Sequence, residues 1–353
     1  MLWRIRGVRI LLKGDASTMK KLLIALIFII VFSVLLTGCG KKAENSNNKL
    51  VIYTSMKESL IGGIVEGFKK KHPEIEIDYQ SAGAGKLIEK IAAERQSGQI
   101  MADIIWTSEV PDFYQMKQDD LLEAYTPTEF PNVINPFEDY EGFFTAARLG
   151  TLGIVVNTDN VKTLPVSWEE IATNPIYKDS FGIADPALSG TSFMSVALLE
   201  KEFGWDYIAR LRKNGASKSK GSGQVVDNTA SGSLNACLGV DYIAKSKIEK
   251  GAHLTMVYPK ELLMVPSPIA IFKNAANMEN AKAFVNYVLS EEAQEKVAES
   301  GTVPVRKNVK LPRGYSLPTP EEAMERGIKV NYNEVLAKKS EIIEKFSELF
   351  KNT

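Results

Sequence analysis

Apolar residues follow two alternating periods in the part of the chain from about residue 50 to residue 106. Short apolar or alternating runs predict strands over 50–53, 75–79 and 103–106. Between these runs, apolar residues at helical spacing predict helices over 58–71 and 86–96. Strands that alternate with helices of this length usually build a parallel sheet with right-handed crossovers. The pattern therefore predicts an α/β fold.

A second α/β block lies between two long β-type runs at 148–157 and 265–273. Its shorter predicted elements are helices over 167–173 and 192–203 and strands over 182–184, 236–240 and 254–258. Helices are predicted again over 278–289 and 291–300, and the tail from 318 carries an apolar stripe that we expect to pack on the folded body.

We expect two lobes, each a mostly parallel sheet flanked by helices, with the two long runs as hinge strands. The first lobe is predicted to combine residues 50–150 with 268–353, and the second to hold residues 151–267. In open α/β sheets, ligands bind at the carboxyl ends of strands, in the crevice. The loops that follow the strands are therefore the candidate site.

The first 49 residues have a different pattern. A basic Met19-Lys20-Lys21 start precedes an apolar run over 22–36, which is too short to span a bilayer comfortably. We interpret 1–38 as a signal peptide with an N-terminal extension; a transmembrane anchor is the alternative. The ending Leu36-Thr37-Gly38-Cys39 resembles a bacterial lipobox, which implies that Cys39 is lipidated and that the polar segment 39–49 is a tether.

Charge and composition exclude several function classes. Six of the 43 basic residues and one of the 43 acidic residues lie before Cys39, so the rest of the chain has a net charge of about −5. This mild acidity without a basic block argues against nucleic acid as a partner. The chain has two cysteines and two histidines, which leaves no disulfide once Cys39 is lipidated and excludes most histidine-rich zinc sites.

The loops after the predicted strands are rich in small hydroxyl residues and glycine, which suits anion binding through hydroxyl and backbone N–H groups. The segment Ser189-Gly190-Thr191-Ser192 follows a strand and opens a helix, so its N–H groups should face the crevice. The alternative is that Ser189 or Thr191 only caps the helix. The other candidates are Ser55, Gly83, Ser108 and the pair Asp241-Tyr242. For that pair, an N-cap and a half-buried aromatic are the alternative.

Several segments make a family resemblance visible: LVIYTSMKESL (50–60), MADIIWTS (101–108), LGTLGIVVN (149–157), PALSGTSF (186–193), GVDYIAK (239–245), VYPKE (257–261) and AKAFVNYVLSEEAQ (281–294). With them, the chain resembles the substrate-binding proteins of ATP-binding-cassette importers, in the branch that binds ferric ions, phosphonates and hexose phosphates. The resemblance implies the two-lobed type II fold of periplasmic binding proteins. It also implies a flexing hinge and delivery of a solute to a membrane permease.

The iron binders of that branch use a His, a Glu and two adjacent Tyr. Their positions fall here at Met56, Ser108, Asp241 and Tyr242. Ferric iron prefers hard anionic oxygens, and this set supplies few of them. The Ser-Gly-Thr stretch instead matches where the family holds phosphate, so the resemblance favours an organophosphate or phosphonate.

We therefore expect an exported, monomeric solute-binding protein that needs no cofactor and captures a hexose phosphate or an aminoethylphosphonate-type anion. The segment 189–192, with Ser55 and Gly83, is expected to hold the phosphoryl group. Asp241, Asp227 and Glu261 are expected to bind the rest of the ligand. The alternatives are a ferric-ion binder that uses Tyr242 and Asp241, a phosphatase-like enzyme, and a structural lipoprotein. The expected location is the outer face of the cytoplasmic membrane or the periplasm.

Overall fold

The structure is a computed structural model that describes residues 48–351. The predicted signal peptide, Cys39 and nearly all of the predicted tether lie outside the described residues. The described residues belong to one compact unit. Among them, no helix is both long enough and apolar enough to cross a membrane.

Nine strands of the described part form one sheet. In chain order they are β1 (Lys49–Thr54), β2 (Glu76–Ser81), β3 (Ile104–Trp106), β4 (Thr145–Asn157), β5 (Phe181–Ala184), β6 (Ser217–Ser219), β7 (Ala236–Val240), β8 (Leu254–Val257) and β9 (Leu263–Ile271). They lie in the order β2-β1-β3-β9-β4-β7-β5-β6, and β8 pairs with β4. β1 pairs in parallel with β2 and β3, and β5 in parallel with β6 and β7.

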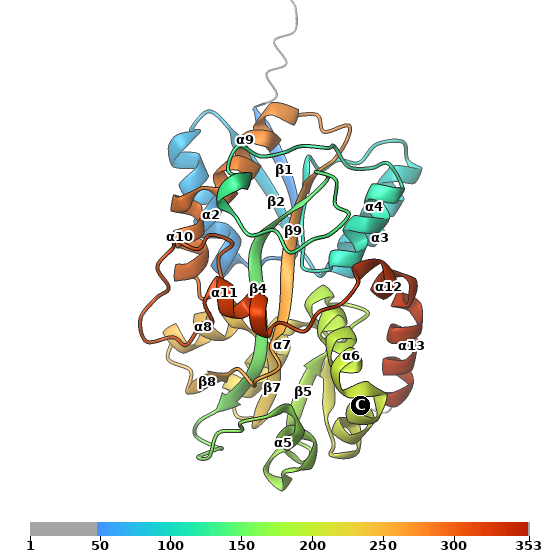
Figure 1. Cartoon of the computed structure of the whole chain (residues 1–353), viewed down its shortest axis with the longest axis vertical. Helices are drawn as coiled ribbons and strands as arrows, with labels where there is room; N and C mark the ends of the chain where they lie inside the picture. The colour runs from blue at the N-terminus through green and yellow to red at the C-terminus, as the bar shows by residue number, and fades with distance from the viewer. Residues whose placement is uncertain (1–47, 352–353) are drawn as a thin grey trace, which may run out of the picture. The chain divides into compact units, whose positions relative to one another are not determined.

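The long strands β4 and β9 join these two parallel groups. They pair antiparallel with each other, and every residue in both is buried. Figure 1 shows them running side by side from the β1–β3 half into the half that holds β5 and β7. Apolar residues make up most of both strands, as expected for strands covered on both faces. The predicted fold class, two parallel-sheet lobes joined by two hinge strands, is confirmed.

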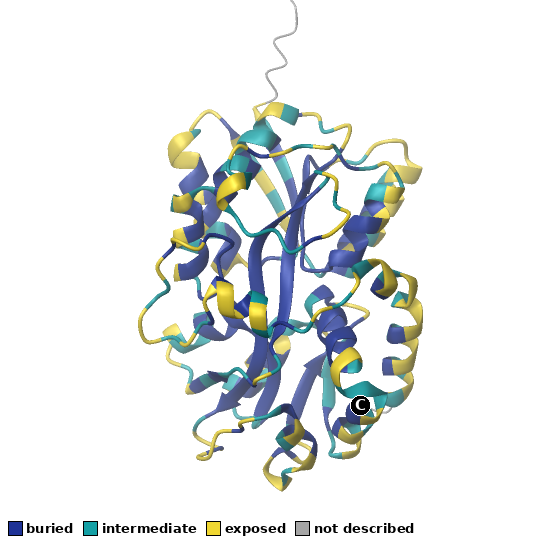
Figure 2. Ribbon diagram, in the orientation of Figure 1, coloured by how far each residue is buried: buried dark blue, intermediate teal, exposed yellow. Residues whose placement is uncertain are grey.

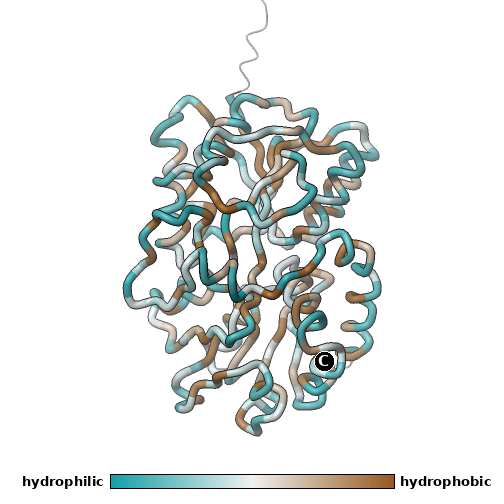
Figure 3. The backbone as a smooth tube through the Cα atoms, in the orientation of Figure 1, coloured by the Kyte–Doolittle hydropathy of each residue, from teal (hydrophilic) through white to brown (hydrophobic). Residues whose placement is uncertain are grey.

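Helices cover the sheet on both faces. They are α2 (Glu58–Lys71), α3 (Ala84–Gln96), α4 (Val110–Gln118), α5 (Trp168–Thr173), α6 (Gly190–Lys213), α7 (Ser222–Ala230), α8 (Asp241–Glu249), α9 (Met278–Leu289), α10 (Glu291–Glu299), α11 (Pro320–Arg326), α12 (Tyr332–Ala337) and α13 (Lys339–Leu349). The inner strands are buried, the edge strands β2 and β6 are half-buried or exposed, and the outer helices expose one side (Figure 2). Hydrophobic and hydrophilic stretches alternate along these helices (Figure 3). This pattern is that of helices with one face against a core.

The observed helices differ in part from the predicted ones. α6 begins at Gly190, two residues before the predicted start, and continues to Lys213. Gly204, with φ of 73°, is not helical and divides α6 into two segments, the first of which ends where the predicted helix 192–203 ends. The sequence analysis missed α4, which carries Pro111 in its first turn and is buried along most of its length. It also missed α7, whose polar residues hide its helical period.

The C-terminal tail contacts both halves. α12 packs against α4, while α13 packs against α6. Ile342, Phe346 and Phe350 of the predicted apolar stripe are buried, so the tail does pack on the body. The lobe boundaries at 150 and 268 stay a prediction. The contact with α6 leads us to propose that the last helix belongs with the second lobe.

Candidate functional site

A cavity of about 360 Å³ lies where the carboxyl ends of both parallel strand groups meet. We call it the cleft. Its lining comes from residues at or just after the ends of β1, β2, β3, β5, β6 and β7: Ser55, Lys57, Ser81, Ala82, Gly83, Ala84, Lys86, Ser108, Leu188, Ser189, Gly190, Thr191, Lys220, Gly221, Ser222, Val240, Tyr242 and Ile243. The expectation that strand ends converge on one crevice is therefore met.

Five helices begin at this cleft. The N-cap residues of α2, α3, α6, α7 and α8 all line it: Lys57, Gly83, Ser189, Gly221 and Val240. Among these five, only the Ser189 side chain caps its own helix, by accepting from the Ser192 N–H. The first N–H groups of a helix lack partners within it and carry partial positive charge. Five such ends on one cavity favour a negatively charged ligand.

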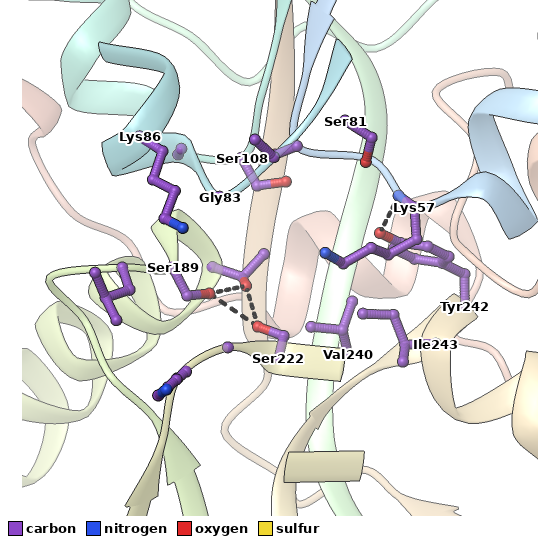
Figure 4. Close-up of a pocket in the computed structure, with 18 residues that line it drawn as sticks. Lys57, Ser81, Gly83, Lys86, Ser108, Ser189, Ser222, Val240, Tyr242 and Ile243 are labelled. Carbon is purple, nitrogen blue, oxygen red and sulfur yellow. Dashed lines mark hydrogen bonds between the residues drawn. The ribbon is translucent and has the colours of Figure 1, made fainter. Parts of the chain in front are cut away.

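Three hydroxyl groups form a cluster in the cleft (Figure 4). The Ser189 and Thr191 Oγ atoms are 3.0 Å apart, and each lies 2.9 Å from Ser222 Oγ. The cluster joins the start of α6 to the start of α7. Hydroxyl protons rotate freely, so each of the three can turn from its neighbour toward an anion without any backbone movement.

Three lysines, Lys57, Lys86 and Lys220, also line the cleft, and no Asp or Glu side chain does. All three are exposed, and none forms an ion pair with another described residue. The amino groups of Lys57 and Lys86 point into the cleft from opposite sides (Figure 4). Unneutralised lysines around a concave surface concentrate positive potential there.

Tyr242 lies at the cleft wall and is almost fully buried. Its hydroxyl oxygen accepts from the Lys57 backbone N–H at 3.1 Å, and the Arg148 guanidinium lies over its ring at 5.1 Å. Burial raises the pKa of Tyr242, so the side chain is a neutral phenol. Its own proton finds no acceptor among the described residues and remains available to a ligand.

Asp241, the preceding residue, does not reach the cleft. Its carboxylate is 0 % exposed and lies beneath the cleft wall. There it accepts from the Thr151 N–H at 2.8 Å, the Tyr242 N–H at 2.7 Å and the Thr302 hydroxyl, and it pairs with Arg148 at 3.4 Å. The predicted contact between Asp241 and the ligand is corrected, since every lone pair of this carboxylate serves the fold.

The other predicted residues divide into two groups. Those that line the cleft are Ser55, Gly83, Ser108, Ser189, Gly190, Thr191 and Tyr242. Ser192, Asp227 and Glu261 do not line it. Ser192 donates to the Ala184 carbonyl, Asp227 pairs with Lys247 in an adjoining groove, and the Glu261 carbonyl accepts from the Trp168 ring N–H. The hydroxyl of Ser108 is 2.8 Å from Ser267 Oγ.

Sequence reasoning missed the three lysines and Ser222. Each of the four lies within a few residues of a strand end and a helix start, so the rule that selected Ser55 and Gly83 also covered them. The prediction rested on small hydroxyl residues and glycine, and a lysine at such a position does not stand out, because most lysines are solvent-exposed.

Gly83 and Gly190 allow the two halves to approach each other closely. A Cβ added to Gly83 would lie 2.4 Å from the Leu188 carbonyl oxygen, and one added to Gly190 would lie 2.7 Å from Cβ of Glu109. Gly190 belongs to the segment that was expected to hold the phosphoryl group. The structure gives it a packing reason, because the start of α6 lies against the loop after β3.

Glu109 belongs to a buried charged cluster next to the cleft. Lys339, in the first turn of α13, lies 2.5 Å from a carboxylate oxygen of both Glu109 and Asp112. Two carboxylates share one ammonium, and one Asp112 oxygen has no partner. Burial, together with the Asp112 charge, raises the pKa of Glu109 to about 7.

Ferric iron finds no adequate ligand set among the described residues. No group of three or more His, Cys, Asp or Glu side chains is placed there to hold a metal ion. Met56 is buried, and Asp241 is engaged as described. The phenol of Tyr242 alone makes a poor ferric site.

Comparisons with known proteins agree with the fold. Residues 99–332 match the family described as bacterial extracellular solute-binding protein. A Salmonella typhimurium protein, named as a candidate 2-aminoethylphosphonate-binding periplasmic protein, is 26 % identical over 247 residues, 67 % of this chain and 71 % of that one.

Two solved structures share the architecture. The periplasmic binding protein AfuA of Actinobacillus pleuropneumoniae, with fructose 6-phosphate bound, has a TM-score of 0.74 at 24 % identity, covering 86 % of this chain and 99 % of its own. Iron-bound HitA of Pseudomonas aeruginosa has a TM-score of 0.71 at 22 % identity, covering 85 % and 99 %. At these identities the likeness establishes the fold alone.

Proposed function

Since this chain belongs to the bacterial extracellular solute-binding proteins, we propose that its cleft captures a small phosphorylated or phosphonate anion. A solute-binding component of this kind presents its ligand to the membrane permease of an ATP-binding-cassette importer. The protein is thus a binding protein of transport, and we propose that the bound solute leaves it chemically unchanged.

The groups that surround the cleft support a phosphorylated or phosphonate anion as the ligand. Five helix N-termini, three lysines without ion pairs and no carboxylate surround a single cleft. The hydroxyl cluster of Ser189, Thr191 and Ser222 adds rotatable donors at the start of α6 and α7. A tetrahedral phosphoryl group has three oxygens to accept these bonds, so it uses this arrangement better than a planar carboxylate would. The names of the Salmonella relative and of AfuA support the same class.

Closure of the two halves around a ligand would signal to the permease that the ligand is bound. The loops after β1, β2 and β3 lie on one side of the cleft, and those after β5, β6 and β7 on the other. A ligand that touches both sides favours the closed arrangement, and β4 and β9 are the strands about which the halves would move. We propose that the permease recognises the closed form.

Ferric iron is the second candidate, since HitA, which has the same fold, was solved with iron bound. The described residues do not favour it. The buried Asp241 and the neutral phenol of Tyr242 leave the cleft without the anionic oxygens that iron prefers.

We also propose that the chain is exported and lipid-anchored through Cys39, with the polar segment 39–49 as tether. The family supports an extracytoplasmic location, and the lipobox-like ending supports the anchor. Replacing Cys39 by Ala should leave the protein unprocessed or released from the membrane fraction. An unchanged membrane fraction would contradict the lipid anchor.

The test of the proposed function is binding by the full-length protein in a mild detergent. Melting followed by tryptophan fluorescence is measured with fructose 6-phosphate, glycerol 3-phosphate, inorganic phosphate, unphosphorylated fructose and ferric citrate. A ligand that binds only the folded state raises the melting temperature by mass action. We expect an increase with a phosphorylated compound and none with fructose. Stabilisation by ferric citrate alone would overturn the proposal.

A further inference from the structure

The charges around the cleft narrow the ligand class further. Resting on the proposed function, we infer that the solute carries a second negatively charged group besides its phosphoryl group. A solute with an ammonium group in that position is rejected.

One end of the cleft is suited to the phosphoryl group. The hydroxyl cluster lies there with the starts of α6 and α7, and Lys220 precedes Ser222 by two residues. Lys86 extends toward Ser189 from the first turn of α3 (Figure 4). Two lysines and three hydroxyls are a full set of donors for one phosphoryl group, so a third lysine is not needed at this end.

The other end carries that third lysine. Lys57, Tyr242, Val240 and Ile243 lie together on the opposite side of the hydroxyl cluster (Figure 4). The Lys57 backbone N–H is bonded to the Tyr242 hydroxyl, which fixes the phenol beside the lysine. The phenol proton and the Lys57 ammonium are both donors without an acceptor in the described structure. A carboxylate or a second phosphoryl group would accept from both.

An ammonium group would find no acceptor of opposite charge here. The nearby carboxylates are all engaged elsewhere. Asp241 is sealed beneath the wall, and Glu109 pairs with Lys339. In the adjoining groove, Asp227 pairs with Lys247, and Glu58 accepts from the Tyr79 hydroxyl. A cation at this end would lose water and meet Lys57 instead of a partner, and both effects oppose binding.

The experiment uses three phosphonates that differ only in the group on the second carbon: 2-carboxyethylphosphonate, ethylphosphonate and 2-aminoethylphosphonate. Their affinities for the full-length protein are measured by titration calorimetry. We expect the carboxylate to bind at least tenfold more tightly than the ethyl compound, and the ammonium compound to bind more weakly than either. Equal affinities, or tightest binding of the ammonium compound, would overturn the inference.

Variants of Lys57 test whether the second negatively charged group of the solute binds at this lysine. Lys57→Gln should abolish the preference for the carboxylate but keep binding of ethylphosphonate within about threefold. Lys57→Glu should reverse the order in favour of 2-aminoethylphosphonate. Lys250→Gln is the matched control, because it removes the same charge from the adjoining groove that Lys57 and Lys250 both line, and it should leave the order unchanged. If Lys250→Gln alters the preference as much as Lys57→Gln does, the effect is general electrostatics and the inference is wrong.

The inference and the proposed function fail in different ways. If no phosphonate and no phosphate ester binds, the proposed function itself is wrong. If ethylphosphonate or fructose 6-phosphate binds as tightly as the carboxylate-bearing compound, the proposed function stands and only the second charge is refuted.

Discussion

In the described part of the chain, charged groups lack ion-pair partners on the surface of the cleft, whereas they are paired in the layer directly beneath it. On the surface, Lys57, Lys86 and Lys220 face water without ion-pair partners among the described residues. Beneath it, Arg148 and Asp241 are fully buried and bonded to each other and to Thr302. The two regions adjoin each other, because Tyr242 lines the cleft while Asp241, its neighbour in the chain, lies below.

The difference shows where binding free energy is available. A polar group whose bonds are complete gains little from a ligand, whereas an unpaired donor gains a bond when the ligand arrives. The buried layer also ties the hinge strand β4 to α8, since Arg148 and Thr151 belong to β4 and both contact Asp241 at the start of α8. Substitutions should therefore change stability in the lower layer and affinity in the upper one.

The largest expected effect is in the buried layer. Arg148→Met leaves the Asp241 carboxylate buried without its charge partner. Removing one partner of a buried pair destabilises proteins by about 3–5 kcal/mol. Chemical denaturation of the variant measures the loss in unfolding free energy. The double variant Arg148→Met with Asp241→Asn should recover part of it, because no uncompensated charge remains. A loss below about 1 kcal/mol would show that the pair contributes little.

The second effect is in the cleft. Ser189→Asp places a negative charge in the hydroxyl cluster, and we expect affinity for the phosphorylated ligand to fall by at least a hundredfold, about 2.7 kcal/mol. Asp is as good an N-cap as Ser, so α6 should keep its stability. Ser189→Asn is the matched control, because it also caps the helix but adds no charge. Calorimetric titration and a melting curve separate binding from folding. Equal affinities of the two variants would contradict an anion at this position.

The third prediction concerns the buried cluster in which Glu109 and Asp112 share the ammonium of Lys339. The pKa of Glu109 rises from 4.5 to about 7, so the folded state holds a proton that the unfolded state has released. Stability from this group is therefore complete below pH 4.5 and is lost as the pH rises to about 7. We expect the protein to lose about 2–3 kcal/mol between pH 5 and pH 8 relative to Glu109→Gln. Denaturation at both pH values measures this. Parallel stability profiles of the two proteins would refute it.

The fold was largely predictable from the sequence. The alternation of apolar periods located β1, α2, β4 and β9 within a few residues, because burial on one face or both leaves a periodic trace in the sequence. α4 and α7 left weaker traces. Nearly all of α4 is buried and it begins with a proline at its second position, while α7 has few apolar residues.

The site was only partly predictable. Chain order places Ser189 and Tyr242 at strand ends, and both line the cleft as expected. The direction in which a side chain points is not encoded in strand order, so Asp241 could not be separated from Tyr242 beforehand. The lysines were missed because their function depends on what surrounds them. An exposed lysine becomes significant only when no carboxylate lies nearby, and that is a property of the folded chain.

The smallest expected effect lies where the two regions meet. Tyr242→Phe removes the acceptor of the Lys57 N–H and the donor that faces the cleft. Because the Lys57 N–H is near water, we expect a loss of stability of about 0.5–1.5 kcal/mol, the range of a single hydrogen bond. Affinity for 2-carboxyethylphosphonate should fall severalfold, while that for ethylphosphonate should change little. Melting curves and the two titrations measure these effects. If the affinities for both phosphonates fall equally, Tyr242 shapes the whole cleft and not only the end next to Lys57. Tyr242 would then belong to the supporting layer and not to the binding surface.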